Sequence, residues 1–110
     1  MDDPGDAFRI DEDRTEDAVV LTLHGELDLA SADAVQQRLD ALAEAGTPTR
    51  LDLDDLRFMD SSGLRVVLQA AERSRTAGWA FTITPGSEQV RTLFSSAGIT
   101  GRLPIEEEPA

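Results

Sequence analysis

Apolar residues recur along this chain with two spacings, one typical of strands and one typical of helices. In the strand-like segments they alternate with polar residues or form short β-branched runs, such as residues 18–23 before Gly25. Alternation places one set of side chains on the buried face of a sheet. The segments that follow this pattern are residues 8–10, 18–23, 50–54, 79–84 and 102–105.

Three further segments carry apolar side chains at the spacing of an amphipathic helix. We predict helices over residues 29–45, 63–77 and 88–97, and a glycine directly follows each of them. A serine stands near the start of each helix, where its hydroxyl can accept a hydrogen bond from a free amide. The expected N-caps are therefore Ser31, Ser62 and Ser87.

The resulting order is strand-strand-helix-strand-helix-strand-helix-strand. This alternation predicts an α/β fold in which helices cover one sheet. Right-handed crossovers between successive strands would make much of that sheet parallel. A length of 110 residues is sufficient for one domain around a single two-layer core.

The chain is acidic, with 22 acidic against 10 basic residues and a net charge of -12. Residues 1–17 and 106–108 hold much of this excess, so the body of the chain is close to neutral. We predict an acidic flexible N-terminus over residues 1–7, a domain over residues 8–105 and an acidic C-terminal tail over residues 106–110. Nucleic acids and anionic membranes require clustered basic side chains, so neither is expected as a partner.

The expected compartment follows from what the sequence lacks. There is no cysteine, which excludes thiol nucleophiles, thiolate metal sites and disulfides. No apolar run approaches the roughly 20 residues that cross a bilayer, and the first residues are acidic where a signal peptide is basic. These features predict a cytoplasmic protein.

A hydrolase would need a nucleophile with a base beside it. Ser61 or Ser62 with His24, the one histidine of the chain, is the available combination, but no G-x-S-x-G elbow surrounds the serines. A lone histidine at the end of a strand is usually a surface or loop residue. We therefore expect no enzyme activity and no catalytic residue.

The acidic run from Asp52 to Asp60 raises two other hypotheses. Asp52 and Asp54 share a strand face and two carboxylates can bind a hard cation, but the spacing matches no calcium loop. A solvated strand end is the favoured interpretation, so no metal or cofactor is expected. The second hypothesis is an aspartyl-phosphate receiver domain. Domains of that kind use a lysine to neutralise the phosphoryl group, and this chain has no lysine, so a receiver domain is not expected.

The segment Asp-Ser-Ser-Gly-Leu, residues 60–64, leads into the second predicted helix. With Ser62 as the expected N-cap, Ser61 precedes the helix and its hydroxyl is freer to face solvent. A phosphate on Ser61 would add about -1.5 to -2 charge beside Asp60 and could switch off an interaction without catalysis by this chain. From the residues alone, a plain helix cap is favoured over a modified serine.

Three segments, in this order, resemble the STAS domain of bacterial anti-sigma factor antagonists. Residues 23–28 resemble the family's turn into its first long helix, and residues 51–64 carry its most specific motif, Asp-Ser-Ser-Gly. Residues 90–99 resemble its third helix and the turn after it. The resemblance covers residues 8–105 and implies a mixed sheet of four to five strands with helices packed mainly on one face.

The resemblance implies a partner-switching regulator. In similar proteins the first serine of this motif, here Ser61, is phosphorylated by the anti-sigma factor, a serine kinase of the histidine-kinase-like ATPase fold. The unphosphorylated form binds the kinase and frees a sigma factor, phosphorylation breaks the complex, and a metal-dependent serine phosphatase restores it. Asp28 is expected beside Ser61 at one end of the sheet. The residues implied to bind the partner are Asp28, Asp60, Ser62, Gly63, Leu64 and, as a weaker candidate, Glu26.

Other members of the family work without a phosphate cycle. Some are scaffold subunits of stressosomes. Others are accessory subunits of phospholipid-transport complexes, which dock on an ATPase subunit through the same end of the fold. The intact Asp-Ser-Ser-Gly motif favours the switch over these alternatives.

Overall fold

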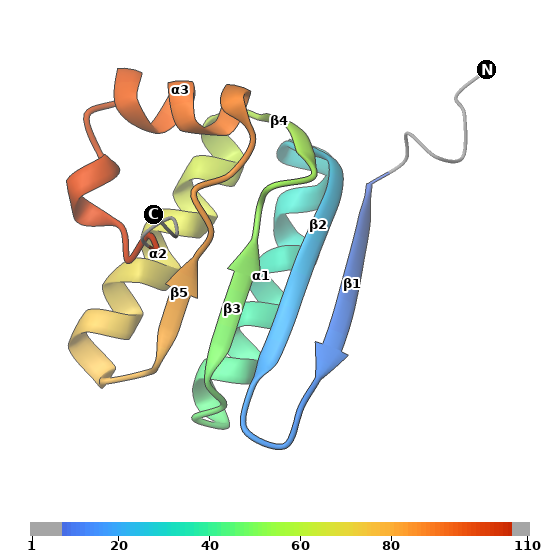
Figure 1. Cartoon of the computed structure of the whole chain (residues 1–110), viewed down its shortest axis with the longest axis vertical. Coiled ribbons are helices and arrows are strands. Elements are labelled where there is room, and N and C mark those ends of the chain that lie inside the picture. Colours follow the sequence, from blue (N-terminus) through green and yellow to red (C-terminus); the bar gives the residue numbers. More distant parts are fainter. Residues whose placement is uncertain (1–7, 107–110) are drawn as a thin grey trace.

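The computed structural model describes residues 8–106 and arranges them as one sheet with helices around it (Figure 1). The predicted flexible N-terminus over residues 1–7 and most of the predicted acidic tail lie outside the described residues. In chain order the elements are β1 (Arg9–Arg14), β2 (Val19–Leu27), α1 (Leu29–Glu44), β3 (Thr49–Asp52), β4 (Leu56–Met59), α2 (Ser61–Ala77), β5 (Phe81–Ile83), α3 (Glu88–Ser96) and the short 3-10 helix η2 (Thr100–Arg102).

The described strands form a mixed five-stranded sheet. Its order is β1-β2-β3-β5, and β4 pairs with the end of β2 that β3 leaves uncovered. β1 runs antiparallel to β2, whereas β3, β4 and β5 run parallel to their neighbours. The predicted α/β fold with a mixed sheet of four to five strands is therefore confirmed.

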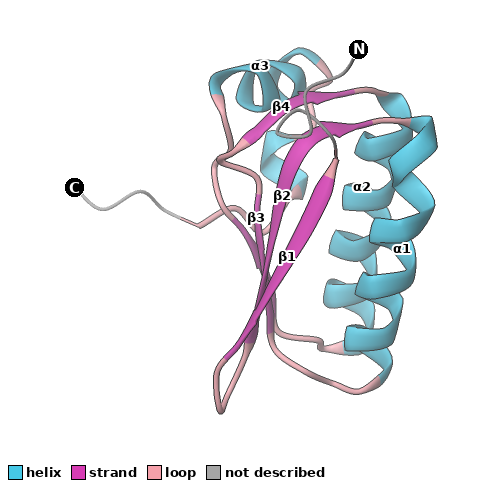
Figure 2. Cartoon of the chain, turned by 90° about the vertical axis from the view of Figure 1, so that its right-hand side faces the viewer, coloured by secondary structure: helices cyan, strands magenta, loops and turns pink. Residues whose placement is uncertain are grey.

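The helices lie mainly on one face of the sheet, as predicted. α1 and α2 cover that face together, while α3 lies at one end of the sheet against β4 (Figure 2). Burial alternates along β2, so Leu21, Leu23 and Leu27 point toward the two helices and are fully buried. Burying a leucine side chain contributes about 2 kcal/mol of transfer free energy, and this row supplies the centre of one continuous core.

Two of the three helix starts differ from the prediction. α1 is capped by Asp28 rather than Ser31, and α2 is capped by Asp60 rather than Ser62. In both cases the preceding strand runs up to the aspartate, which is then the single residue between strand and helix. Aspartate caps a helix as well as serine does, so the strand ends decide the choice. Ser87 caps α3 as predicted.

The prediction from the apolar pattern missed β4, and it placed a last strand over residues 102–105 where the structure has only a single bridge. β4 reads buried, exposed, exposed, buried, so it lacks the alternation that identifies a strand from sequence. Its register against β2 shifts between Gly25 and Glu26, and this irregularity accounts for the lost alternation. The strand predicted over residues 102–105 is instead the end of η2 followed by a single bridge between Ile83 and Ile105.

None of the helices in the described part of the chain is both long and apolar enough to cross a membrane.

Candidate functional site

The starts of α1 and α2 lie side by side at one end of the sheet. β2 and β4 are parallel neighbours, and their last residues, Leu27 and Met59, are partners in the register. The backbone amide of Asp60 donates to the carbonyl of Leu27 over 3.1 Å, which ties the two strand ends together. Asp28 and Asp60 therefore occupy equivalent positions, each between the end of a strand and the start of a helix.

The carboxylate of Asp28 is engaged in capping α1. It accepts a hydrogen bond from the backbone amide of Ala30 at 3.0 Å. Ser31 completes a capping box, because its hydroxyl accepts from the Asp28 amide at 3.0 Å and donates to the Glu26 carbonyl at 2.9 Å. Asp28 thus fixes the direction in which α1 leaves the sheet, close to the segment that contains Ser61.

The two serines of the motif have different surroundings. The Asp60 carboxylate accepts from the backbone amides of Ser62 and Gly63, at 2.8 and 3.3 Å, and so caps α2. Ser61 is the first helical residue and is exposed, whereas Ser62 is half-buried. Neither hydroxyl hydrogen-bonds to another residue between positions 8 and 106. The expected cap role of Ser62 is therefore wrong, and the exposed hydroxyl belongs to Ser61.

Gly63 allows α2 to approach the sheet closely. It is buried in the first turn of the helix, and a Cβ atom there would lie 2.7 Å from Leu27 Cγ and 2.8 Å from Met59 Cγ. Carbon atoms in contact are ordinarily 3.5 to 4.0 Å apart. The glycine of the motif therefore has a packing role that holds the start of α2, and Ser61 with it, against the ends of β2 and β4.

Ser61 lies between two surface hollows. One, of about 570 Å³, runs between α1 and α2; the other, of about 590 Å³, runs along α2 toward η2. The first is lined by Leu29, Ala32, Asp33, Gln36, Asp40, Ser61, Ser62, Arg65, Val66 and Gln69. The second is lined by Ser61, Leu64, Arg65, Leu68, Gln69, Glu72, Arg75 and Arg102.

The structure gathers most of the predicted partner-binding residues around this helix start, but not all of them. Leu64 is half-buried against the core and lines the second hollow with Ser61. Glu26 is exposed, and the alternation along β2 places its side chain on the opposite face from the buried Leu27. Within the described chain, no hydrogen bond or ion pair links the Glu26 side chain to Ser61.

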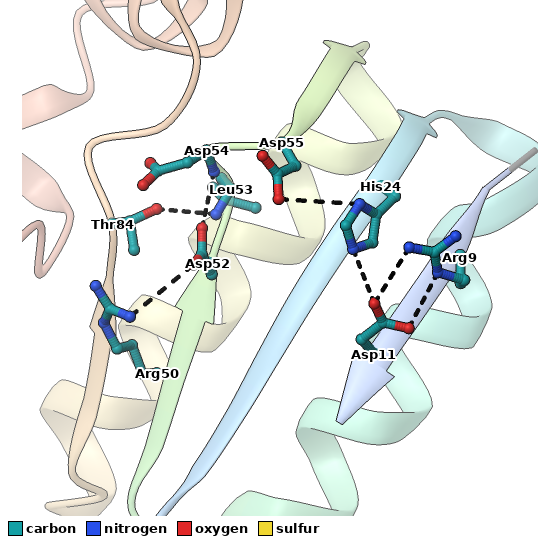
Figure 3. Close-up of polar contacts among 9 residues, drawn as sticks. All are labelled: Arg9, Asp11, His24, Arg50, Asp52, Leu53, Asp54, Asp55 and Thr84. Atoms are coloured by element: carbon teal, nitrogen blue, oxygen red, sulfur yellow. Dashed lines mark hydrogen bonds and ion pairs between the residues drawn. The ribbon is translucent and has the colours of Figure 1, made fainter. Parts of the chain in front are cut away.

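His24 belongs to a polar network on the sheet face opposite α1 and α2 (Figure 3). Its Nε2 lies 2.9 Å from an oxygen of Asp11 on β1, and its Nδ1 lies 3.9 Å from Asp55. Both ring nitrogens therefore face carboxylates. No described contact connects this imidazole with Ser61 or Ser62, so the structure does not bring together the pair that a serine hydrolase would need.

The acidic run after β3 is used for local backbone contacts. The Asp52 carboxylate accepts from the Asp54 amide at 3.0 Å, and the Asp54 carboxylate accepts from the Gly86 amide at 3.0 Å. Arg50 also lies 3.9 Å from Asp52 (Figure 3). Among residues 8–106 no three histidine, aspartate or glutamate side chains are grouped so that they could hold a metal ion.

Ion pairs with arginines lower the pKa values of carboxyl groups on the sheet, among them Asp11 and Glu106. The Arg9 guanidinium hydrogen-bonds to Asp11 and, with His24, lowers the pKa of that carboxyl. Arg50 hydrogen-bonds to both oxygens of Glu106, at 2.8 and 3.0 Å, and lowers the pKa of Glu106. The contact between Asp11 and His24 links β1 to β2, and the pair of Arg50 and Glu106 links the end of the described chain to β3.

Two residues beside Ser61 were not predicted to matter. Leu29 is the first residue of α1, is 80% exposed and lines the hollow between the helices. Arg65 lies four residues after Ser61 on α2 and lines both hollows. The sequence contained a signal for each: a leucine directly after the Asp28 turn, and an arginine at the i+4 position from the serine.

Comparisons with known proteins agree on the fold. The family model described as "Mlab, STAS domain" matches residues 10–105. The chain is 30% identical to the anti-sigma-B factor antagonist of Bacillus subtilis (strain 168) over 92 residues, which cover 84% of each protein.

Solved structures extend the likeness to three dimensions. An anti-sigma factor antagonist from Mycobacterium paratuberculosis aligns with a TM-score of 0.78 at 20% identity, covering 98% of this chain and 92% of the other. The phosphorylated form of the Bacillus cell fate determinant SpoIIAA aligns with a TM-score of 0.68 at 24% identity, covering 93% of each chain. At these identities the likeness shows the same fold.

Proposed function

The chain belongs to the STAS domain family, and from this premise we propose that it is an anti-sigma factor antagonist controlled by phosphorylation of Ser61. In its unphosphorylated form it binds an anti-sigma serine kinase of the histidine-kinase-like ATPase fold in the cytoplasm, and so frees a sigma factor. The observation that carries the proposal is the exposed hydroxyl of Ser61 at the start of α2, between two surface hollows. The role named for the Bacillus subtilis relative and the phosphorylated form of SpoIIAA support it.

The electrostatics of the site explain how a phosphate would break the complex. Two capping carboxylates, Asp28 and Asp60, already stand at this end of the sheet. A phosphate on Ser61 adds about -1.5 to -2 further charge at neutral pH. A partner surface that fits a neutral hydroxyl among these groups then loses hydrogen bonds and meets a concentrated negative charge. Release on phosphorylation, and renewed binding after a serine phosphatase removes the phosphate, follow from this change.

Exposure favours Ser61 over Ser62 as the phosphorylated residue. A kinase must bring the γ-phosphate of ATP in line with the hydroxyl oxygen, which requires open space around it. Ser61 is exposed and borders both hollows, whereas Ser62 is half-buried and borders one. In this proposal Asp28, Asp60, Ser62 and Leu64 form the surface that the kinase contacts, the buried Gly63 holds the start of α2 in place beneath it, and Glu26 extends the surface along β2.

The proposal is tested by comparing serine variants as baits for the kinase. Ser61→Ala, which cannot accept phosphate, should retain an ATP-dependent serine kinase from an extract of the native host in the presence of ATP. Ser61→Asp, which carries a permanent negative charge, should retain much less. Ser96→Ala, an exposed serine at the end of α3, is the matched control and should behave like the unmodified protein.

The outcomes separate the switch from its alternative. Equal retention of the kinase by Ser61→Ala and Ser61→Asp would overturn the proposal. If neither variant binds a kinase and the same non-kinase subunits bind both, the chain acts as a stressosome scaffold or as an accessory of a phospholipid-transport complex. A purified kinase that modifies Ser61→Ala but not Ser62→Ala would move the phosphorylation site to Ser62.

A further inference from the structure

Arg65 occupies the position from which a cation can reach a group on Ser61. The two residues are four apart on α2, so their side chains lie on one face of the helix, with Cβ atoms about 6 Å apart. Both line the hollow between α1 and α2, and both line the hollow along α2. An acidic group that precedes a basic one at this spacing is the more favourable order, because it also suits the helix dipole.

Arg65 differs from the other arginines of α2 in having no partner among the residues that the structure describes. Arg73 pairs with Asp40 of α1, at 3.3 Å, and Arg75 pairs with Glu72 of its own helix. Arg65 is exposed and forms no ion pair or side-chain hydrogen bond with any residue between positions 8 and 106. Its guanidinium group is therefore available in the unmodified protein.

The backbone at the start of α2 is a poor alternative ligand for a phosphate on Ser61. The Asp60 carboxylate already accepts hydrogen bonds from the amides of Ser62 and Gly63. Two other cations, Arg75 and Arg102, also line the hollow along α2, but Arg75 lies about 20 Å from Ser61 along the helix axis and Arg102 lies beside Arg75. The carboxylates at this end are Asp60 itself, Asp28 from the end of β2, and Asp33 and Asp40 from α1, which line the hollow between the helices. They repel a phosphate, whereas Arg65 attracts it.

We infer that Arg65 is the phosphate-binding residue of the switch: once Ser61 is phosphorylated, the Arg65 guanidinium folds back over one helical turn and holds the phosphate at the mouth of the two hollows. The inference rests on the proposed phosphorylation of Ser61 and adds the group that receives the phosphate. The pairing fixes the added charge at the partner-binding surface. It also favours the doubly ionised phosphate, so the switch carries its full charge near neutral pH.

The test uses the full chain with phosphoserine installed at position 61 during translation, so no kinase is needed. The second ionisation of the phosphate is followed by phosphorus NMR across pH 4 to 9 in the otherwise unmodified chain, in Arg65→Gln and in Arg65→Lys. Arg75→Gln is the matched control, because it removes one positive charge from the same helix at a position roughly 20 Å from Ser61 along the helix axis. Salt screens interactions over that distance.

The expected result is a phosphate pKa that is higher in Arg65→Gln by about 0.5 unit, intermediate in Arg65→Lys and unchanged in Arg75→Gln. When both proteins carry the phosphate, the Tm of the otherwise unmodified chain should be higher than that of Arg65→Gln. Without the phosphate, the two proteins should have the same Tm. Equal phosphate pKa values in Arg65→Gln and Arg75→Gln would overturn the inference. Because the phosphate is installed synthetically, that result leaves the proposed phosphorylation by a kinase untouched, and failure of the kinase test leaves this one intact.

Discussion

Replacing Gly63 by alanine would place a methyl group against two buried residues at the ends of β2 and β4. The new Cβ would lie 2.7 Å from Leu27 Cγ, 2.9 Å from Leu27 Cδ2 and 2.8 Å from Met59 Cγ. Leu27 is fully buried and Met59 is 5% exposed, so neither side chain has free space beside it. α2 must therefore move away from the sheet by several tenths of an ångström, or both side chains must leave their preferred rotamers.

Two opposing effects set the size of the change. Alanine is favoured over glycine in a helix by about 1 kcal/mol, and less in the first turn. Inserting a methyl group into a well-packed core costs about 1–3 kcal/mol. Because three carbon contacts fall below 3.0 Å, the packing cost should prevail. We expect Gly63→Ala to lower the free energy of unfolding by about 1–2 kcal/mol.

Urea unfolding followed by the fluorescence of Trp79 measures this change. Gly101→Ala is the matched control, because a Cβ atom at that position has no neighbour within 4 Å. It should leave the midpoint unchanged or raise it slightly. If Gly63→Ala is as stable as Gly101→Ala, the close approach of α2 to the sheet is not what requires glycine, and the packing explanation of the motif is refuted.

Two further predictions concern the caps and the charges. Asp60→Ala removes the acceptor of two backbone amides at the start of α2 and should cost about 1 kcal/mol in urea unfolding, against a few tenths for Asp33→Ala on the exposed face of α1; equal costs would contradict the cap assignment. Glu106 has a pKa lowered mainly by hydrogen bonds from Arg50, so its contribution is present above the unfolded pKa, near 4.5, and is lost as the pH falls through the lower folded value. Glu106→Gln should therefore lower stability at pH 7, by at most about 1 kcal/mol because the pair is partly exposed, and change it little at pH 3; a difference that persists at pH 3 would show that the charge of Glu106 is not the cause.

Much of the fold follows from the sequence because its strands and helices have clear periods. The leucines of β2 alternate with polar residues, and the helices carry apolar stripes that end at glycines such as Gly78. β4 has four residues, is irregularly paired and shows no alternation, so its existence depends on the uncovered end of β2, which sequence alone does not reveal. Pairing with β2, which is distant in the sequence, therefore determines that residues 56–59 form a strand.

The site was predicted in outline and misjudged in detail. The motif correctly pointed to the start of α2, but the cap was assigned to Ser62 because serine and aspartate are equally good caps in isolation. The hydrogen bond from the Asp60 amide to the Leu27 carbonyl fixes where the strand ends, and this places Ser61 inside the helix. The role of Gly63, and the lack of a partner for Arg65 between positions 8 and 106, depend on distances between elements, so only the structure shows them.

The most direct test of the central claim is the phosphorylation state of Ser61 in protein purified from its native host. Intact mass combined with fragment mapping identifies both the number of phosphates and the residue that carries them. The account predicts a mixed population in which part of the protein carries one phosphate, on Ser61, in a proportion that changes with growth or stress. Protein that carries no phosphate under all conditions, or carries it on a residue other than Ser61, would contradict the account.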